Sequence, residues 1–112
     1  MSQTTHPVSS ANPPRIEFAS TLPALLAATV RAHADRPFLI RRSAKGGDPV
    51  TFGAFADEVR AIAKGLAALG LQRGDRIALI AENCAEWILV DQACASLGIV
   101  DVPRGADTTP TE

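Results

Sequence analysis

The sequence contains no tyrosine, only two cysteines and two histidines, and a net charge of just −1 over 112 residues. Proteins that bind nucleic acid or anionic membranes usually carry clustered basic residues. The near-neutral charge of this sequence therefore argues against such partners. Glu86 and Asp91 interrupt the most apolar stretch before it reaches the roughly 18 residues of a transmembrane helix. Because a signal-peptide pattern is missing too, the two cysteines indicate a reducing compartment, and we expect a cytoplasmic protein that contacts membranes at most peripherally.

The first 20 residues lack the features of an ordered segment. They are polar, contain Pro7, Pro13 and Pro14, and show neither a basic start nor an apolar core. We therefore expect a flexible leader over residues 1–20 and one domain over residues 21–112. A chain of this length can bury a single core, with roughly 60–70% of the unfolded chain's surface removed from water.

An apolar face predicts a helix directly after the leader. Thr21 is suited to the N-cap, Pro23 falls in the first turn, and the helix should reach about Ala34, before Asp35-Arg36-Pro37 ends it. The residues on this face recur at three- and four-residue steps: Leu22, Leu25, Leu26, Thr29, Val30 and His33.

A β-hairpin is expected next. Residues 38–42 have the composition of a strand, and residues 49–51 can pair with them. The segment Gly46-Gly47-Asp48 is then most simply the turn. A phosphate-binding loop would need glycines that open into a helix with a lysine after them, whereas Lys45 precedes the glycines.

A second, longer helix is predicted from Thr51 to Gly70. Its apolar stripe follows helical spacing: Phe52, Phe55, Val59, Ile62, Leu66 and Leu69. The charged residues Asp57, Glu58, Arg60 and Lys64 fall mainly on the opposite, solvated face. Gly53 and Gly65 each weaken a helix by up to about 1 kcal/mol relative to alanine, so we expect close packing against a neighbour at both.

The last third of the chain has a strand–helix–strand pattern. Residues 76–81 form a short apolar run that predicts a buried strand, and residues 99–102 form a second strand that Pro103 closes. Two such strands joined by one helix make a right-handed parallel crossover, which belongs in a sheet covered by helices. We therefore expect an α/β fold.

The helix of this crossover has start and stop signals. Asn83 and Glu86 have the spacing of a capping box, which predicts a helix beginning near Cys84, and Gly98 suits a left-handed C-terminal cap. Trp87 is expected to anchor the helix on the sheet rather than to form the wall of a ligand pocket.

The histidines and cysteines do not form a metal-binding or nucleophilic pattern. His33 has no second ligand at a suitable spacing, which favours a structural role. Cys84 and Cys94 lie about 15 Å apart along one predicted helix, so they cannot form a disulfide there. We expect both to be small core residues.

Arg104 is the one isolated cation that invites a functional interpretation. It follows the carboxyl end of a predicted parallel strand, where open α/β sheets bind ligands. It could equally pair with Asp101, Asp107 or Glu112. One cation without a phosphate loop does not define a site, so the structural interpretation is favoured.

Several short motifs together resemble the start of the AMP-forming adenylate synthetases, which include acyl-CoA ligases, firefly luciferase and peptide-synthetase adenylation domains. The resemblance covers residues 21–112, and residues 101–112 look most like the bacterial long-chain fatty-acid–CoA ligases. The motifs are Val50-Thr51-Phe52, residues 63–71, Gly74-Asp75-Arg76-Ile77-Ala78-Leu79, Asn83, Glu86-Trp87 and residues 97–103.

The resemblance implies an N-terminal fragment of the large domain of an adenylate-forming enzyme. In this family a carboxylate attacks the α-phosphate of Mg-ATP, and the thiol of coenzyme A then displaces AMP from the acyl-adenylate. The family supplies a Ser/Thr/Gly-rich loop with lysine, a Tyr-Gly-x-Thr-Glu segment, an Asp on the ribose and a C-terminal lysine. None of these occurs here, and neither Lys45 nor Lys64 has the required neighbours. We therefore assign no catalytic, cofactor-binding or metal-binding residue.

The expected function is that of a truncated piece, inactive alone, whose partner is the remainder of the synthetase fold. Fatty acid, ATP and coenzyme A would be bound by the parent enzyme, and residues 108–112 have the composition of an unfinished helix. One alternative is a non-catalytic interaction module that uses the charged face of residues 57–64. Another is an unrelated small nucleotide-binding α/β domain, although the turn at residues 81–84 has no glycine.

Overall fold

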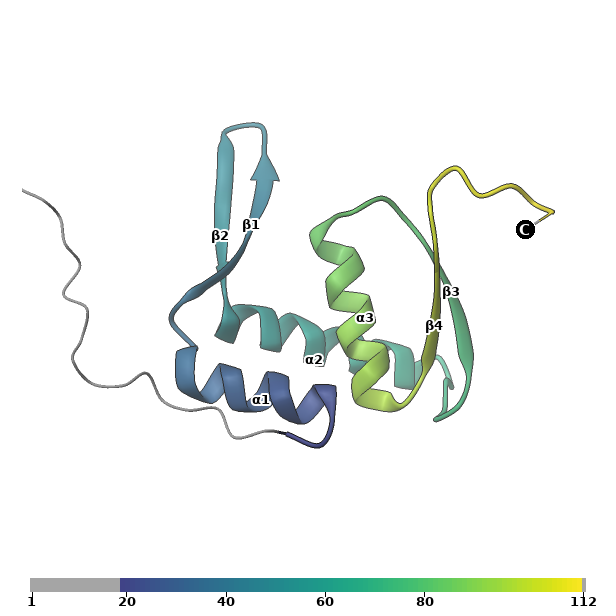
Figure 1. The fold of residues 1–112 in the computed structure, drawn as a ribbon, viewed down its shortest axis with the longest axis horizontal. Coiled ribbons are helices and arrows are strands. Elements are labelled where there is room, and N and C mark those ends of the chain that lie inside the picture. Colours follow the sequence, from purple (N-terminus) through teal and green to yellow (C-terminus); the bar gives the residue numbers. More distant parts are fainter. Residues whose placement is uncertain (1–18, 112) are drawn as a thin grey trace, which may run out of the picture.

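A computed structural model describes residues 19–111, so the expected leader lies outside the described residues apart from Ala19 and Ser20. Three helices and two two-stranded sheets alternate along the chain. Figure 1 shows α1 and α2 side by side, with α3 standing between the two sheets. The elements are α1 (Leu22–His33), β1 (Pro37–Ser43), β2 (Gly46–Thr51), α2 (Phe52–Ala68), β3 (Arg76–Ile80), α3 (Ala85–Leu97) and β4 (Val100–Arg104).

Threonine caps start the first two helices. The Oγ1 atom of Thr21 accepts a hydrogen bond from the backbone N–H of Ala24 at 3.2 Å, as the sequence predicts. Thr51 does the same for Ala54 at 3.1 Å. Each bond satisfies one of the N–H groups that a helix start leaves without a partner.

The two glycines within α2 have different environments. The N–H of Gly53 donates to the carbonyl of Ala34 at 2.9 Å, and a Cβ at Gly53 would lie 3.1 Å from that oxygen. The expected close packing is confirmed there. It is wrong for Gly65, because a Cβ there would meet no atom within 4 Å.

The hairpin forms as predicted, but its turn lies earlier in the chain. Ser43 pairs with Gly46 in the antiparallel register, so Ala44 and Lys45 make a two-residue connection. The predicted turn at Gly46-Gly47-Asp48 is wrong, since these residues lie in β2. A Cβ at Gly47 would lie 2.3 Å from Cγ2 of Ile40, so this glycine serves close side-chain packing rather than chain reversal.

The parallel crossover is confirmed. β3 and β4 pair from Arg76 opposite Val100 to Ile80 opposite Arg104. Gly98 has φ of +72°, which gives the left-handed cap that the sequence predicts after α3. The second strand, β4, begins one residue later than expected and continues through Pro103. Pro103 pairs with Leu79, and an edge strand can accommodate a proline there.

The start of α3 differs from the predicted capping box. The N-cap is Cys84, whose side chain makes no capping hydrogen bond, and Asn83 lies one residue too early. With Cys84 as cap, the third helical position is Trp87 rather than Glu86. The reciprocal bonds of a capping box therefore cannot form.

The main core cluster joins α2 to α3. Its fully buried members are Phe55 and Val59 on α2 and Leu89 and Ala93 on α3. The ring of Phe38 lies 4.7 Å from that of Phe55, centroid to centroid, and so fixes the base of the hairpin on α2. The predicted stripe of α2 fails at its end, where Leu69 is 80% exposed. The sequence gives no periodic signal for Leu89, because α3 carries apolar residues on most of its sides.

The outer side of the parallel pair carries exposed apolar residues. Ile80 is 58% exposed and Val100 is 50% exposed, whereas Ile99 just before β4 is buried. Within residues 19–111, no helix has the length and hydrophobicity needed to cross a bilayer. The cytoplasmic location and the peripheral membrane contact stay predictions.

Candidate functional site

A groove lies between β1 and the start of α3. It has a volume of about 730 Å³, with residues 39–42 on one side and residues 83–88 on the other. Trp87, which was expected to be a sheet anchor, is half-buried and lines this groove, as does the exposed Cys84. The prediction that Cys84 is a core residue is therefore wrong. It holds for Cys94, which is fully buried.

Arg41 connects three elements at this groove. Its Nη2 atom donates to Oε2 of Glu58 on α2 at 3.0 Å and lies 3.9 Å from Oε1 of Glu86 on α3. The Arg41 side chain is 37% exposed and that of Glu58 is 42% exposed, so water weakens the pair. The Nε atom of Arg41 is buried and has no hydrogen-bond acceptor. The guanidinium is thus only partly satisfied by the described residues.

A second polar group lies between α3 and β4. Burial raises the pKa of Asp91, and hydrogen bonding to Asp101 together with its negative charge raises that pKa further. Burial, followed by the charges of Asp101 and Asp91, also raises the pKa of the Cys94 thiol. A raised pKa keeps this thiol protonated and unreactive. The sequence did not predict this pair, because helix phase and strand register together place the two carboxyls face to face.

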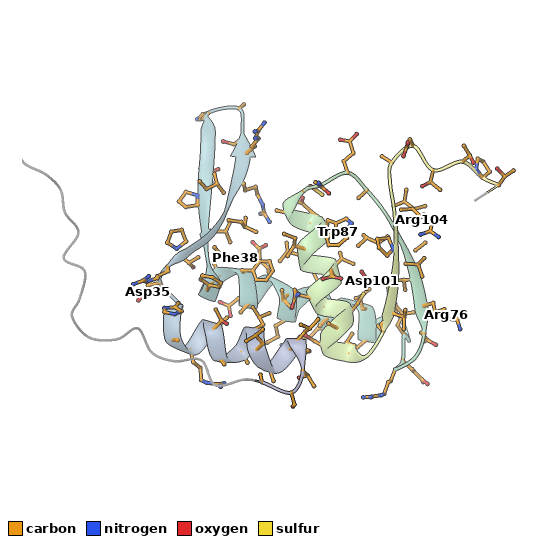
Figure 2. The ribbon with its side chains drawn as sticks, in the orientation of Figure 1. Asp35, Phe38, Arg76, Trp87, Asp101 and Arg104 are labelled. Atoms are coloured by element: carbon orange, nitrogen blue, oxygen red, sulfur yellow. The ribbon has the colours of Figure 1, made fainter. Side chains whose placement is uncertain are left out.

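Arg104 makes a local backbone contact in the described structure. Figure 2 shows it at the end of β4, with Arg76 at the opposite end of the parallel pair. Its Nη1 atom donates to the carbonyl of the preceding Pro103 at 2.9 Å. Within residues 19–111 it forms no ion pair with Asp101 or Asp107, and Glu112 lies outside that range.

The described residues do not supply a place for a nucleotide phosphate or a metal. The connection from β3 to α3 contains no glycine and carries the exposed carboxylate of Glu82, which would repel an anion. Lys45 lies in the hairpin turn, and Lys64 is exposed on α2. His33 is half-buried in the last turn of α1, and no three metal-ligating side chains of residues 19–111 come together.

Comparison with known proteins establishes the family. Residues 26–112 match the family model of the AMP-binding enzymes. The chain belongs to this family. The match excludes the alternative of an unrelated small nucleotide-binding domain, and it agrees with the motifs spread through the long helix and the crossover.

Named relatives of this AMP-binding chain are acyl-CoA ligases. It is 38% identical over 81 residues to the mitochondrial medium-chain acyl-CoA ligase ACSF2 of Danio rerio, which is 72% of this chain and 13% of the relative. It is 41% identical over 54 residues to the long-chain-fatty-acid–CoA ligase FadD15 of Mycobacterium tuberculosis, which is 48% of this chain and 9% of the relative. The chain thus spans a small fraction of each relative.

Solved structures contain the same arrangement of elements. The crystal structure of IdnL1 matches with a TM-score of 0.76 and 28% identity, over 84% of this chain and 19% of that one. The N-terminal subdomain of NpsA from Klebsiella oxytoca matches with a TM-score of 0.73 and 23% identity, over 81% of this chain and 23% of that one. The second likeness, at this identity, concerns the fold alone.

Proposed function

We propose that this chain is the N-terminal part of an ATP-dependent, AMP-forming acyl-CoA ligase and that it acts as scaffold rather than as catalyst. One observation carries the proposal: nearly all of the described fold matches IdnL1, yet it accounts for only 19% of that chain. The fold of residues 19–111 is thus used elsewhere as one portion of a much larger adenylate-forming protein. The named relatives point to acyl-CoA ligation.

The proposed reaction of the complete enzyme has two steps. A fatty-acid carboxylate attacks the α-phosphate of ATP, which releases pyrophosphate, and the thiol of coenzyme A then attacks the acyl carbon and releases AMP. ATP, magnesium and coenzyme A are the proposed cofactors and substrates of that enzyme. The long-chain class of fatty acid rests on residues 101–112 and on the similarity to FadD15.

The chain alone should not activate a carboxylate, because residues 19–111 contain no positioned set of groups for the charge that develops on the α-phosphate during adenylyl transfer. Such chemistry needs cations and backbone amides around the phosphate, whereas the turn from β3 to α3 carries the exposed carboxylate of Glu82. The contribution of the described residues is to position α3 and the parallel strands. This makes the chain a partner of the remaining synthetase fold.

A graft tests the proposal directly. In ACSF2, the 81 matched residues are replaced by the matching residues of this chain, and fatty-acid-dependent exchange of pyrophosphate into ATP is measured. We expect the graft to retain exchange and the isolated chain to show none above background. Exchange by the isolated chain would contradict the scaffold role. A graft that folds but shows no exchange would contradict the proposal that this chain forms the N-terminal part of an acyl-CoA ligase.

The alternative of a non-catalytic interaction module has little support from the charged face of residues 57–64. Arg60 Nη1 and Asp57 Oδ1 lie 3.1 Å apart and neutralise one another, and Glu58 pairs with Arg41. Three of the four charged residues of this face are therefore paired, and Lys64 alone offers little to steer a partner. Co-purification with a defined chain that lacks synthetase motifs would favour the module instead.

A further inference from the structure

We propose that the groove between β1 and the start of α3 is the docking surface for an acidic segment of the remaining adenylate-forming domain, whose carboxylate pairs with the Arg41 guanidinium. The inference rests on the proposed function and adds to it the surface, the anchoring residue and the chemistry of the occupant. Three features of the groove carry it.

The first feature is the size and lining of the groove. A hollow of about 730 Å³ separates β1 from the first turns of α3. The hollow is open at the surface, so a segment of chain can enter it. Leu39, Ile40, Trp87 and Ile88 contribute apolar walls. A peptide segment is the kind of occupant that fills such a space.

The second feature is the incomplete pairing of Arg41. A guanidinium has five N–H donors, and one of them, on Nη2, reaches an acceptor, Glu58, within hydrogen-bond distance. Glu86 stays 3.9 Å away, and the buried Nε lacks any acceptor. Leaving such a donor unpaired costs free energy, and a further carboxylate in the groove would remove that cost once the guanidinium turns toward it.

The third feature is the charge at this end of α3. Cys84 gives no side-chain cap, and of the first N–H groups of α3 only that of Trp87 donates to the Cys84 carbonyl, at 3.2 Å. The N–H groups of Ala85 and Glu86 keep their partial positive charge. Arg41 and Arg42 line the groove against the single carboxylate of Glu86. Glu58 lies outside the lining and pairs with Arg41, so the uncompensated charge of the groove is that of Arg42, which forms no ion pair within residues 19–111. This cation complements an acidic segment rather than a basic one.

We expect the segment that fills the groove to belong to the rest of the domain, because most of the matched protein IdnL1 lies outside the matched region. IdnL1 has the same fold over 84% of this chain, while 81% of its own length lies outside the match, since the match covers 19% of it. A second copy of this chain would bring the same cationic groove to itself, so charge disfavours that pairing.

Cys84 provides a native probe of the groove. Its thiol is exposed and free and lines the groove, whereas Cys94 is buried. Alkylation of each cysteine by a maleimide is followed peptide by peptide, in the isolated chain and in the ACSF2 graft described above. We expect Cys84 to react at least about tenfold more slowly in the graft, because the docked segment excludes the reagent. Equal rates of Cys84 alkylation in the folded graft would overturn the proposal.

Variants of the graft test the charge. Arg41→Gln removes a charged hydrogen bond to the docked segment, so the segment should leave the groove more often and Cys84 should be alkylated about tenfold faster. Arg41→Lys keeps the positive charge and should recover part of the protection of Cys84. Arg60→Gln is the matched control: it removes another guanidinium–carboxylate pair, outside the groove, and should change the rate less than about twofold. Equal effects of the two glutamine variants would reject the carboxylate pairing. If pyrophosphate exchange is retained while Cys84 stays reactive, the docking surface is wrong but the proposed function stands.

Discussion

The two carboxyl groups of Asp91 and Asp101 show how single residues couple the helix to the sheet. Asp91 lies on α3 and Asp101 on β4, and both are partly buried. Burial and the neighbouring Asp101 raise the pKa of Asp91 above its usual value of 3.8. The folded state therefore binds a proton more tightly than the unfolded state does. The stability that the protonated Asp91 side chain contributes is fully present below the pKa of this group in the unfolded state. That contribution is lost as the pH rises through its pKa in the folded state.

Replacing Asp91 by asparagine should stabilise the chain at pH 7. The substitution removes a like-charge contact, which typically costs about 1 kcal/mol or less. The urea midpoint is followed through the fluorescence of Trp87, the single tryptophan, which lies on α3 as Asp91 does. We expect the variant to have the higher midpoint at pH 7, with the difference shrinking as the pH falls through the raised pKa of Asp91.

Asp57→Asn is the control for this pH experiment. Asp57 is a carboxylate 78% exposed in its side chain, and it pairs with Arg60 rather than with another acid. Its replacement should lower the midpoint slightly or leave it unchanged at pH 7. A gain in midpoint for Asp91→Asn that is as large at pH 4 as at pH 7 would show that repulsion is not the cause.

At the scale of the elements, the two glycines of α2 make a matched test of packing. Gly65→Ala should stabilise the chain by about 0.5–1 kcal/mol, because alanine favours the helix and its methyl group meets no atom. Gly53→Ala should be destabilising, because its methyl group would press on the backbone carbonyl of Ala34 and disturb the junction of α1 and α2. Urea titration followed by circular dichroism at 222 nm measures both, and a stabilised Gly53 variant would contradict the packing.

The elements themselves were predictable where a signal is local. Thr21 and Thr51 lie at helix starts and Gly98 lies at a helix end. Such positions can be predicted because a cap depends on one side chain or one backbone angle. The hairpin turn and the start of α3 were misplaced by a few residues, because Gly47 is required by the distant Ile40 and Asn83 precedes the true cap. The groove around Arg41 was not predictable, since it depends on where β1, α2 and α3 meet in space.

At the scale of the whole molecule, the described fold has a small core and much open surface. Its fully buried hydrophobic residues are Phe55, Val59, Leu89, Ala93, Cys94 and Ile99. The parallel pair β3–β4 has only two strands, and Ile80 and Val100 lie exposed on it. Parallel strands are normally covered on both faces and joined by further strands. A single small core cannot offset the conformational entropy of many ordered residues by a wide margin.

The isolated chain should therefore pack more loosely than the same residues in the ACSF2 graft and bind a hydrophobic dye strongly. The fluorescence of 8-anilinonaphthalene-1-sulfonate reports the exposed apolar surface, while near-ultraviolet circular dichroism reports fixed packing around Trp87. We expect high dye binding and weak near-ultraviolet signals for the chain alone. In the ACSF2 graft, the Trp87 environment should become fixed, because the remaining domain covers β3–β4 and the groove. A monodisperse isolated monomer with one sharp thermal transition and no dye binding would show that six buried residues suffice to hold this fold.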